Sequence, residues 1–189
     1  IQIFGSCLLW IVPLLGFGFR FREFILIQST NLKATQRDLF PLWATSLFSI
    51  VAMASLANIW NVFFPLKWFG SLIWILGIIN FGLVSPKLIK EFTYKFIINS
   101  LLIGSLILSC LCLLALFAQA HYDSGLYHLP AIRWAQNYPT AIGLANLHSR
   151  LGFNSLWFVF AASVDLPWIS TNLNFCSNLL IAFFFSFGI

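Results

Sequence analysis

Long runs without a charged residue alternate with short polar segments along most of the chain. A helix needs about 20 apolar residues to cross the hydrocarbon core of a membrane. Four uncharged runs reach about that length, at residues 1–19, 43–64, 68–84 and 96–118. A fifth run begins near Leu173. We therefore predict an all-α, polytopic integral membrane protein, with four transmembrane helices in residues 1–118.

The polar segments between these runs differ in their content of Lys and Arg. Residues 20–42 and 85–95 hold most of these cations, whereas the connections at 65–67 and 119–154 hold fewer. Cytoplasmic loops carry an excess of Lys and Arg. We therefore expect 20–42 and 85–95 to be cytoplasmic loops, and 119–154 to face outward, toward the periplasm if the membrane is a bacterial inner membrane.

The remaining segment, 155–189, is expected to hold further membrane helices of a truncated, longer chain. Charged residues enclose the run 151–164, which is only about 21 Å of helix at 1.5 Å per residue and cannot span alone. A helix that starts near Thr140 would be long enough, and it would align Asn146, Arg150 and Asn154 in one polar stripe. Asp165 with Pro167 then predicts a cytoplasmic turn.

The composition excludes two broad classes of protein. Of the 189 residues, 60% are hydrophobic and 8% are charged, whereas a soluble domain has about 25% charged residues. The formal net charge of +5 is spread over short clusters, so no helix or face can form a phosphate-binding patch for nucleic acid. The four cysteines all lie in apolar runs, and we interpret them as buried, inert thiols.

Reactive side chains converge only in the predicted outer loop, which contains all three histidines of the chain. They are His121, His128 and His148, joined by Asp123, Arg133 and Arg150. A divalent metal ion is left open here, although the spacing matches no compact metal motif. Asp123 has two interpretations, as a functional carboxylate or as the cap of a short surface helix that begins after it. Pro130 predicts a kink or a second helix start.

Two stretches of this loop carry a family resemblance: Tyr122-Asp-Ser-Gly-Leu-Tyr-His and Asn146-Leu-His-Ser-Arg-Leu-Gly-Phe-Asn-Ser. Together they resemble a family of bacterial polytopic membrane proteins without an assigned activity. More distantly, the Asp at the outer end of a membrane helix, followed by a small residue and Gly-Leu-Tyr, resembles the first outer loop of GT-C membrane glycosyltransferases. Protein mannosyltransferases and aminoarabinose transferases belong to that class.

The resemblance implies a fold, a reaction and a set of site residues. It implies a GT-C-like transfer of a sugar from a polyprenyl-phosphate carrier to an acceptor. Asp123 would be the catalytic carboxylate, and the substrate-binding residues would be Tyr127, His128, Asn146, His148 and Arg150. An Arg suits a lipid phosphate because its planar fork donates two hydrogen bonds. The sequence departs from the better-known members, because Ser124 stands where a Glu usually follows the Asp.

Two other functions stay open from the residues themselves. A transporter or flippase for a lipid-linked or anionic solute would use the stripe of Asn146, Arg150 and Asn154 as its path. A non-catalytic membrane subunit would use the outer loop as a docking surface. In each case the partners include membrane lipid, and the sequence leaves the oligomeric state undetermined.

Overall fold

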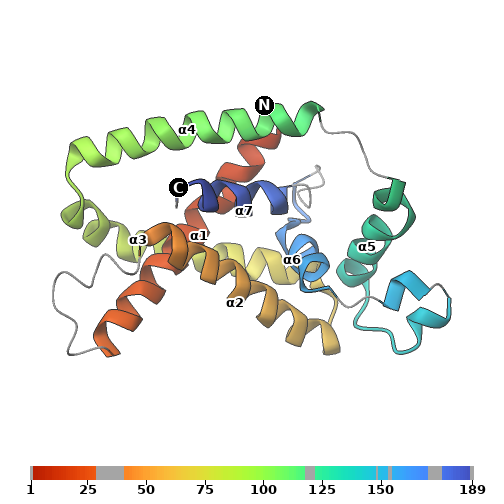
Figure 1. Cartoon of the computed structure of the whole chain (residues 1–189). Coiled ribbons are helices and arrows are strands. Elements are labelled where there is room, and N and C mark those ends of the chain that lie inside the picture. The colour runs from red at the N-terminus through yellow and green to blue at the C-terminus, as the bar shows by residue number, and fades with distance from the viewer. Residues whose placement is uncertain are drawn as a thin grey trace. The chain divides into compact units, whose positions relative to one another are not determined.

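The structure is a computed structural model that describes residues 2–28, 41–117, 122–147, 149–152, 155–169 and 176–187, and throughout these residues the regular structure is helical. Figure 1 shows the helices in chain order from red to blue. The long helices are α1 (Gln2–Gln28), α2 (Leu42–Phe63), α3 (Phe69–Glu91) and α4 (Tyr94–Phe117). Shorter elements follow: η3 (Ser124–His128), α5 (Leu129–Asn137), η4 (Leu144–Asn146), η5 (Ser149–Gly152), α6 (Leu156–Val164) and α7 (Cys176–Ser186).

Four of these helices have the length and composition of membrane spans. They are Ile3–Ile27, Leu42–Phe63, Leu66–Lys90 and Tyr94–Phe117, with 22 to 25 residues each. A span of the hydrocarbon core needs about 20 residues, so each is long enough. The chain is an all-helical protein with the features of a membrane-embedded one, as the pattern of apolar runs predicts.

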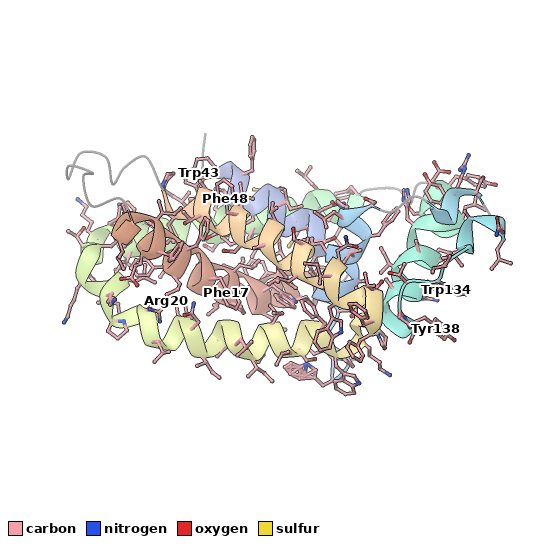
Figure 2. All side chains as sticks on the ribbon, turned by 90° about the horizontal axis from the view of Figure 1, so that it is seen from below. Phe17, Arg20, Trp43, Phe48, Trp134 and Tyr138 are labelled. Carbon is pink, nitrogen blue, oxygen red and sulfur yellow. The ribbon has the colours of Figure 1, made fainter. Side chains whose placement is uncertain are left out.

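The prediction of a polar loop at 20–42 is wrong in its first part, because α1 continues to Gln28. Arg20 and Glu23 lie one turn apart on α1, and their charged groups approach to 3.7 Å. The same Glu23 accepts from Lys87 Nζ of α3 at 2.7 Å. Because these charges find partners while the backbone stays helical, they do not end the helix. Figure 2 shows Arg20 on the side of α1 that faces α3, where its Nε donates to Asn80 Oδ1 at 3.1 Å.

The predicted loop at 85–95 is also mostly helix. The helix α3 continues through Pro86 to Glu91, and α4 begins at Tyr94, so only Phe92 and Thr93 separate them. Phe92 N donates to Leu88 O at 3.1 Å and extends the helical bonding by one residue. The basic residues therefore mark the ends of helices in this segment and not a long connection.

The chain divides into two compact units, and the first holds residues 1–51, 74–116 and 178–189. In this unit α1 packs closely against α2 and α3 through small residues. A Cβ placed at Gly18 would lie 2.5 Å from Ser46 Oγ, and one at Gly77 would lie 2.5 Å from Pro13 Cβ. Such close approach through small residues is typical of helix packing in membranes. The cysteines differ from the prediction in part, since Cys7 and Cys176 are buried but Cys110 is exposed.

The second unit holds residues 52–73 and 117–177. At its centre lies α6, whose residues Val159 to Val164 are all buried. The start of α3 approaches it so closely that a Cβ at Gly70 would lie 2.0 Å from the carbonyl oxygen of Ser163. The helix α5 packs against α6 and against η2 (Leu66–Trp68), the short turn between α2 and α3. This unit contains the described part of the predicted outer loop.

Candidate functional site

Asp123 does not cap the helix that follows it. Its backbone is itself helical, with φ −63° and ψ −24°, and its carboxylate makes no capping hydrogen bond. The next five residues form a π-helical turn, Ser124–His128, and α5 begins at Leu129 with Pro130 in its first turn. The helical backbone is continuous from Tyr122 to Asn137, so Pro130 lies where the π-helical turn passes into α5 and does not mark a separate helix start. The capping interpretation of Asp123 is wrong, because a residue with helical backbone angles lacks the extended geometry of a cap.

The carboxylate of Asp123 instead forms an ion pair with Arg150. The distance from Arg150 Nη1 to Asp123 Oδ1 is 2.7 Å, which is the length of a charge-assisted hydrogen bond. The two side chains come from segments 27 positions apart in the chain. They are partly shielded from solvent, with 27% of the Asp123 side chain and 44% of the Arg150 side chain exposed. The fold thus joins the two predicted site residues that carry charge.

A ring from η3 completes this group. The guanidinium carbon of Arg150 lies 5.1 Å from the centroid of the Tyr127 ring, within the range of a cation–π interaction. The ring restricts where the guanidinium can point, while the carboxylate fixes one of its nitrogen atoms. We refer to Asp123, Tyr127 and Arg150 together as the carboxylate–guanidinium cluster.

His128 adjoins this cluster through its aromatic contacts. The centroid of its ring lies 4.3 Å from that of the Tyr127 ring, in an edge-on arrangement, and 5.2 Å from that of the Phe158 ring on α6. Edge-to-face contacts of this kind contribute about 0.5–1.5 kcal/mol beyond the area buried. Through Phe158, α6 therefore supports the position of η3.

The predicted stripe of Asn146, Arg150 and Asn154 does not form a single helix. Thr140 is not helical, and Gly143 has a left-handed backbone with φ +86°. Asn146 then lies on η4 and Arg150 on the separate turn η5, so no continuous helix can align them. The reason is that Thr140 bonds elsewhere, with its backbone N–H donating to Asn61 O at 2.7 Å. The predicted site residue His148 lies outside the described residues, as do His121 and the stripe residue Asn154.

Sequence reasoning missed one residue that fixes this region, Asn61 near the end of α2. It is only 5% exposed, and its amide Nδ2 lies 3.1 Å from both Ala135 O and Tyr138 O at the end of α5. The same residue accepts from the Thr140 backbone through its own carbonyl. A polar residue inside an otherwise apolar span was the available signal, because such residues face protein and not lipid. Asn61 joins the end of a predicted span to the end of α5.

The turn predicted at Asp165 and Pro167 is confirmed, and Ile169 N donates to Leu166 O across it at 2.9 Å. The cytoplasmic side of this turn stays a prediction. Asp165 Oδ2 accepts from Gln136 Nε2 at 3.0 Å, which joins Asp165 to α5. The preceding helix α6 has nine residues, about 13.5 Å at 1.5 Å per residue, so it cannot carry the chain across a membrane.

Metal ligation receives limited support from the described part of the chain. Among those residues, no three His, Cys, Asp or Glu side chains gather closely enough to hold a metal ion. The divalent ion left open by the sequence would need His121 or His148, which fall outside that part.

Comparisons with known proteins assign a family but no activity. No curated protein matches the chain, and no solved structure matches it either. A family model described as a domain of unknown function, DUF8201, matches residues 1–189. The whole chain therefore belongs to the DUF8201 family.

Proposed function

We propose that this protein is a membrane glycosyltransferase of GT-C type. It moves a sugar from a polyprenyl-phosphate carrier to an acceptor on the outward-facing side of its membrane, which is the periplasmic side if that membrane is a bacterial inner membrane. The observation that carries the proposal is the 2.7 Å pair of Asp123 and Arg150 beside the Tyr127 ring. The resemblance of the Tyr122 to His128 stretch to GT-C outer loops gives the pair its chemical interpretation.

The reaction needs a base and a group that holds the leaving phosphate. In the proposed step, Asp123 accepts the proton of an acceptor hydroxyl while the hydroxyl oxygen attacks the anomeric carbon of the sugar. The bond from that carbon to the carrier phosphate breaks, and the polyprenyl phosphate leaves with the electron pair. A guanidinium carries five N–H donors, so Arg150 can contact the carboxylate and the departing phosphate together.

The packing of the cluster supports this division of roles. The face of Tyr127 restricts the guanidinium, and the contacts from Tyr127 through His128 to Phe158 join the cluster to a buried helix. Groups that are held before the substrate arrives do not have to reorganise in the transition state. Tyr127 and His128 are thus positioning residues in the proposal, and Asp123 is its catalytic residue.

The test uses the full-length protein in native membranes supplied with polyprenyl-phosphate carriers bearing different radiolabelled sugars. Wild type should transfer label to a larger product, and Asp123→Asn should reduce the rate by about 100-fold or more, the range of general-base contributions. Asp165→Asn is the matched control, since it removes a carboxylate that bonds Gln136 and not the cluster. It should keep most of the transfer.

Two results would overturn the proposal. If wild type transfers none of the sugars tested, the protein is not a transferase for these carriers. If Asp123→Asn transfers as fast as wild type at equal amounts of inserted protein, Asp123 is not the base. Arg150→Lys examines the phosphate contact separately, because a lysine keeps the charge but loses the planar fork. Its transfer rate should fall mainly through weaker carrier binding.

A further inference from the structure

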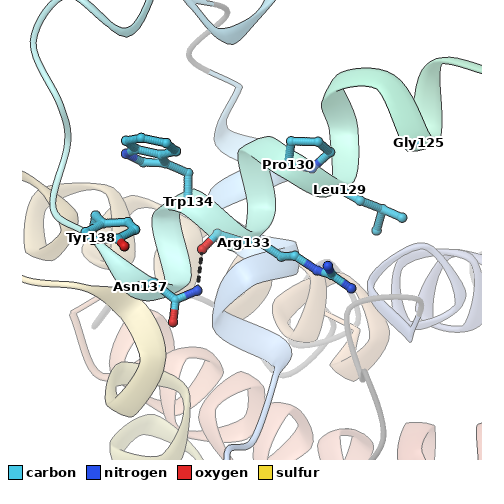
Figure 3. A pocket seen from close by; sticks show the side chains of 7 residues that line it. All are labelled: Gly125, Leu129, Pro130, Arg133, Trp134, Asn137 and Tyr138. Atoms are coloured by element: carbon cyan, nitrogen blue, oxygen red, sulfur yellow. Dashed lines mark hydrogen bonds between the residues drawn. The ribbon is translucent and has the colours of Figure 1, made fainter.

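One face of α5 carries a hollow that lies outside the carboxylate–guanidinium cluster. Its volume is about 450 Å³, and it is open to the surroundings on one side. Figure 3 shows the two rows of side chains, each spaced four residues apart, that bound it. One row is Leu129, Arg133 and Asn137, the other is Pro130, Trp134 and Tyr138, and Gly125 lies at the end.

The lining of this hollow offers a cation that lacks a carboxylate partner among the described residues. The exposed guanidinium of Arg133 has no ion pair with a carboxylate in the described parts of the chain. The hollow therefore favours an anionic occupant with acceptor oxygens.

The position of the hollow relative to the membrane follows from the contacts of α5. The helix packs against η2, the turn that joins α2 to α3, and Asn61 holds its last residues. Because α2 and α3 each have the length of a membrane span, the turn between them lies at a membrane surface. The rings of Trp134 and Tyr138 lie 5.2 Å apart along the hollow (Figures 2 and 3), and such residues favour the headgroup layer.

We propose that this hollow binds the headgroup phosphate of an anionic phospholipid. The guanidinium of Arg133 donates to the phosphate oxygens, while Leu129 and Pro130 contact the glycerol and the upper acyl chain. One cation matches the single charge of a phosphodiester, whereas a phosphate monoester carries nearly two charges near pH 7. The proposal does not depend on the transferase activity, since none of these residues belongs to the cluster.

The first experiment maps where a lipid binds. Full-length protein in phosphatidylcholine nanodiscs receives a small fraction of phosphatidylglycerol that carries a photoreactive diazirine, and the crosslinked peptide is identified by mass spectrometry. Label is expected in residues 129–138. Arg133→Gln should lower the label about fivefold, the effect of one basic contact near a membrane surface.

The matched control is Lys67→Gln. Lys67 is an exposed cation on η2, next to α5 in the same unit, and it does not line the hollow. Its substitution should leave the label in 129–138 unchanged. Equal loss in Lys67→Gln and Arg133→Gln would overturn the site, because the attraction would then come from the general positive charge. Unchanged label in Arg133→Gln would overturn it as well.

Competition distinguishes the sources of phosphate. Unlabelled phosphatidylglycerol should displace the photoreactive lipid, whereas the same concentration of inorganic phosphate or of a polyprenyl phosphate should not. Displacement by inorganic phosphate would show that the site recognises a free anion. Stronger displacement by polyprenyl phosphate would assign the hollow to a carrier lipid. Either of these results contradicts a phospholipid site.

Discussion

The close approach of α3 to α6 makes Gly70→Ala a demanding test of the second unit. The new Cβ would lie 2.0 Å from the carbonyl oxygen of Ser163 and 3.0 Å from that of Asp165. Real Cβ atoms do not approach a neighbour more closely than 3.0 Å, so α6 must move by about 1 Å to relieve the first contact. The obstacle is backbone, which cannot rotate away as a flexible side chain would.

The magnitude of the effect follows from two opposing contributions. Inserting a methyl group into a packed interface costs about 1–3 kcal/mol, and a backbone neighbour places Gly70→Ala near the upper end. Replacing Gly by Ala inside a helix gains up to about 1 kcal/mol, but Gly70 lies in the first turn, where the gain is smaller. We expect the free energy of unfolding to fall by about 2–3 kcal/mol.

The same helix offers the control, Gly82→Ala. A Cβ at Gly82 meets nothing within 4 Å, so only the gain in helix propensity remains. The assay unfolds the purified full-length protein in detergent micelles with increasing sodium dodecyl sulfate and follows tryptophan fluorescence. Gly70→Ala should unfold at a lower fraction of sodium dodecyl sulfate than wild type, and Gly82→Ala at an equal or higher one. Equal midpoints for Gly70→Ala and wild type would refute the close approach of α3 and α6.

Three further predictions address the region around the cluster. Asn61→Leu removes the donor to Ala135 O and Tyr138 O, worth about 2 kcal/mol together, so hydrogen exchange of the amides at the end of α5 should accelerate at least tenfold while that of α1 does not change. Gly143→Ala places a Cβ at φ +86° and should lower the unfolding free energy by about 1–2 kcal/mol in the same micelle assay. Tyr127→Leu removes the ring from Arg150, so phenylglyoxal should modify that arginine about two- to fivefold faster, whereas Tyr127→Phe should react like wild type.

The spans were predictable because length and apolarity alone define them. The positions of charged residues predicted the ends of the helices poorly. The sequence pattern ends the first helix at Arg20, but a charge that pairs with a neighbouring helix costs little and allows the helix to continue. Pairing of Glu23 with Lys87 depends on how α1 and α3 pack, and no periodicity along one helix contains that information.

The candidate site was predictable in its residues but not in its arrangement. The segment 119–154 concentrates polar side chains in an apolar chain, which singles out Asp123, Tyr127 and Arg150 from the sequence. Their geometry depends on the turn at Gly143, where the chain leaves the helical path that a four-residue spacing suggests. The role of Asn61 could not be predicted, because its partners are backbone carbonyls of α5. Every residue has such a carbonyl, so the partners leave no signal in the sequence.

The nine-residue length of α6 has a consequence for enzyme fusions that report on which side of the membrane a residue lies. A helix of nine residues, about 13.5 Å long, is too short to cross the hydrocarbon core, so it leaves the parity of membrane crossings unchanged. Enzyme fusions inserted near residue 147 and near residue 169 should then give the same signal, although an apolar run separates them. Hydropathy plots count such a run as a crossing, and every orientation assigned after it is then inverted.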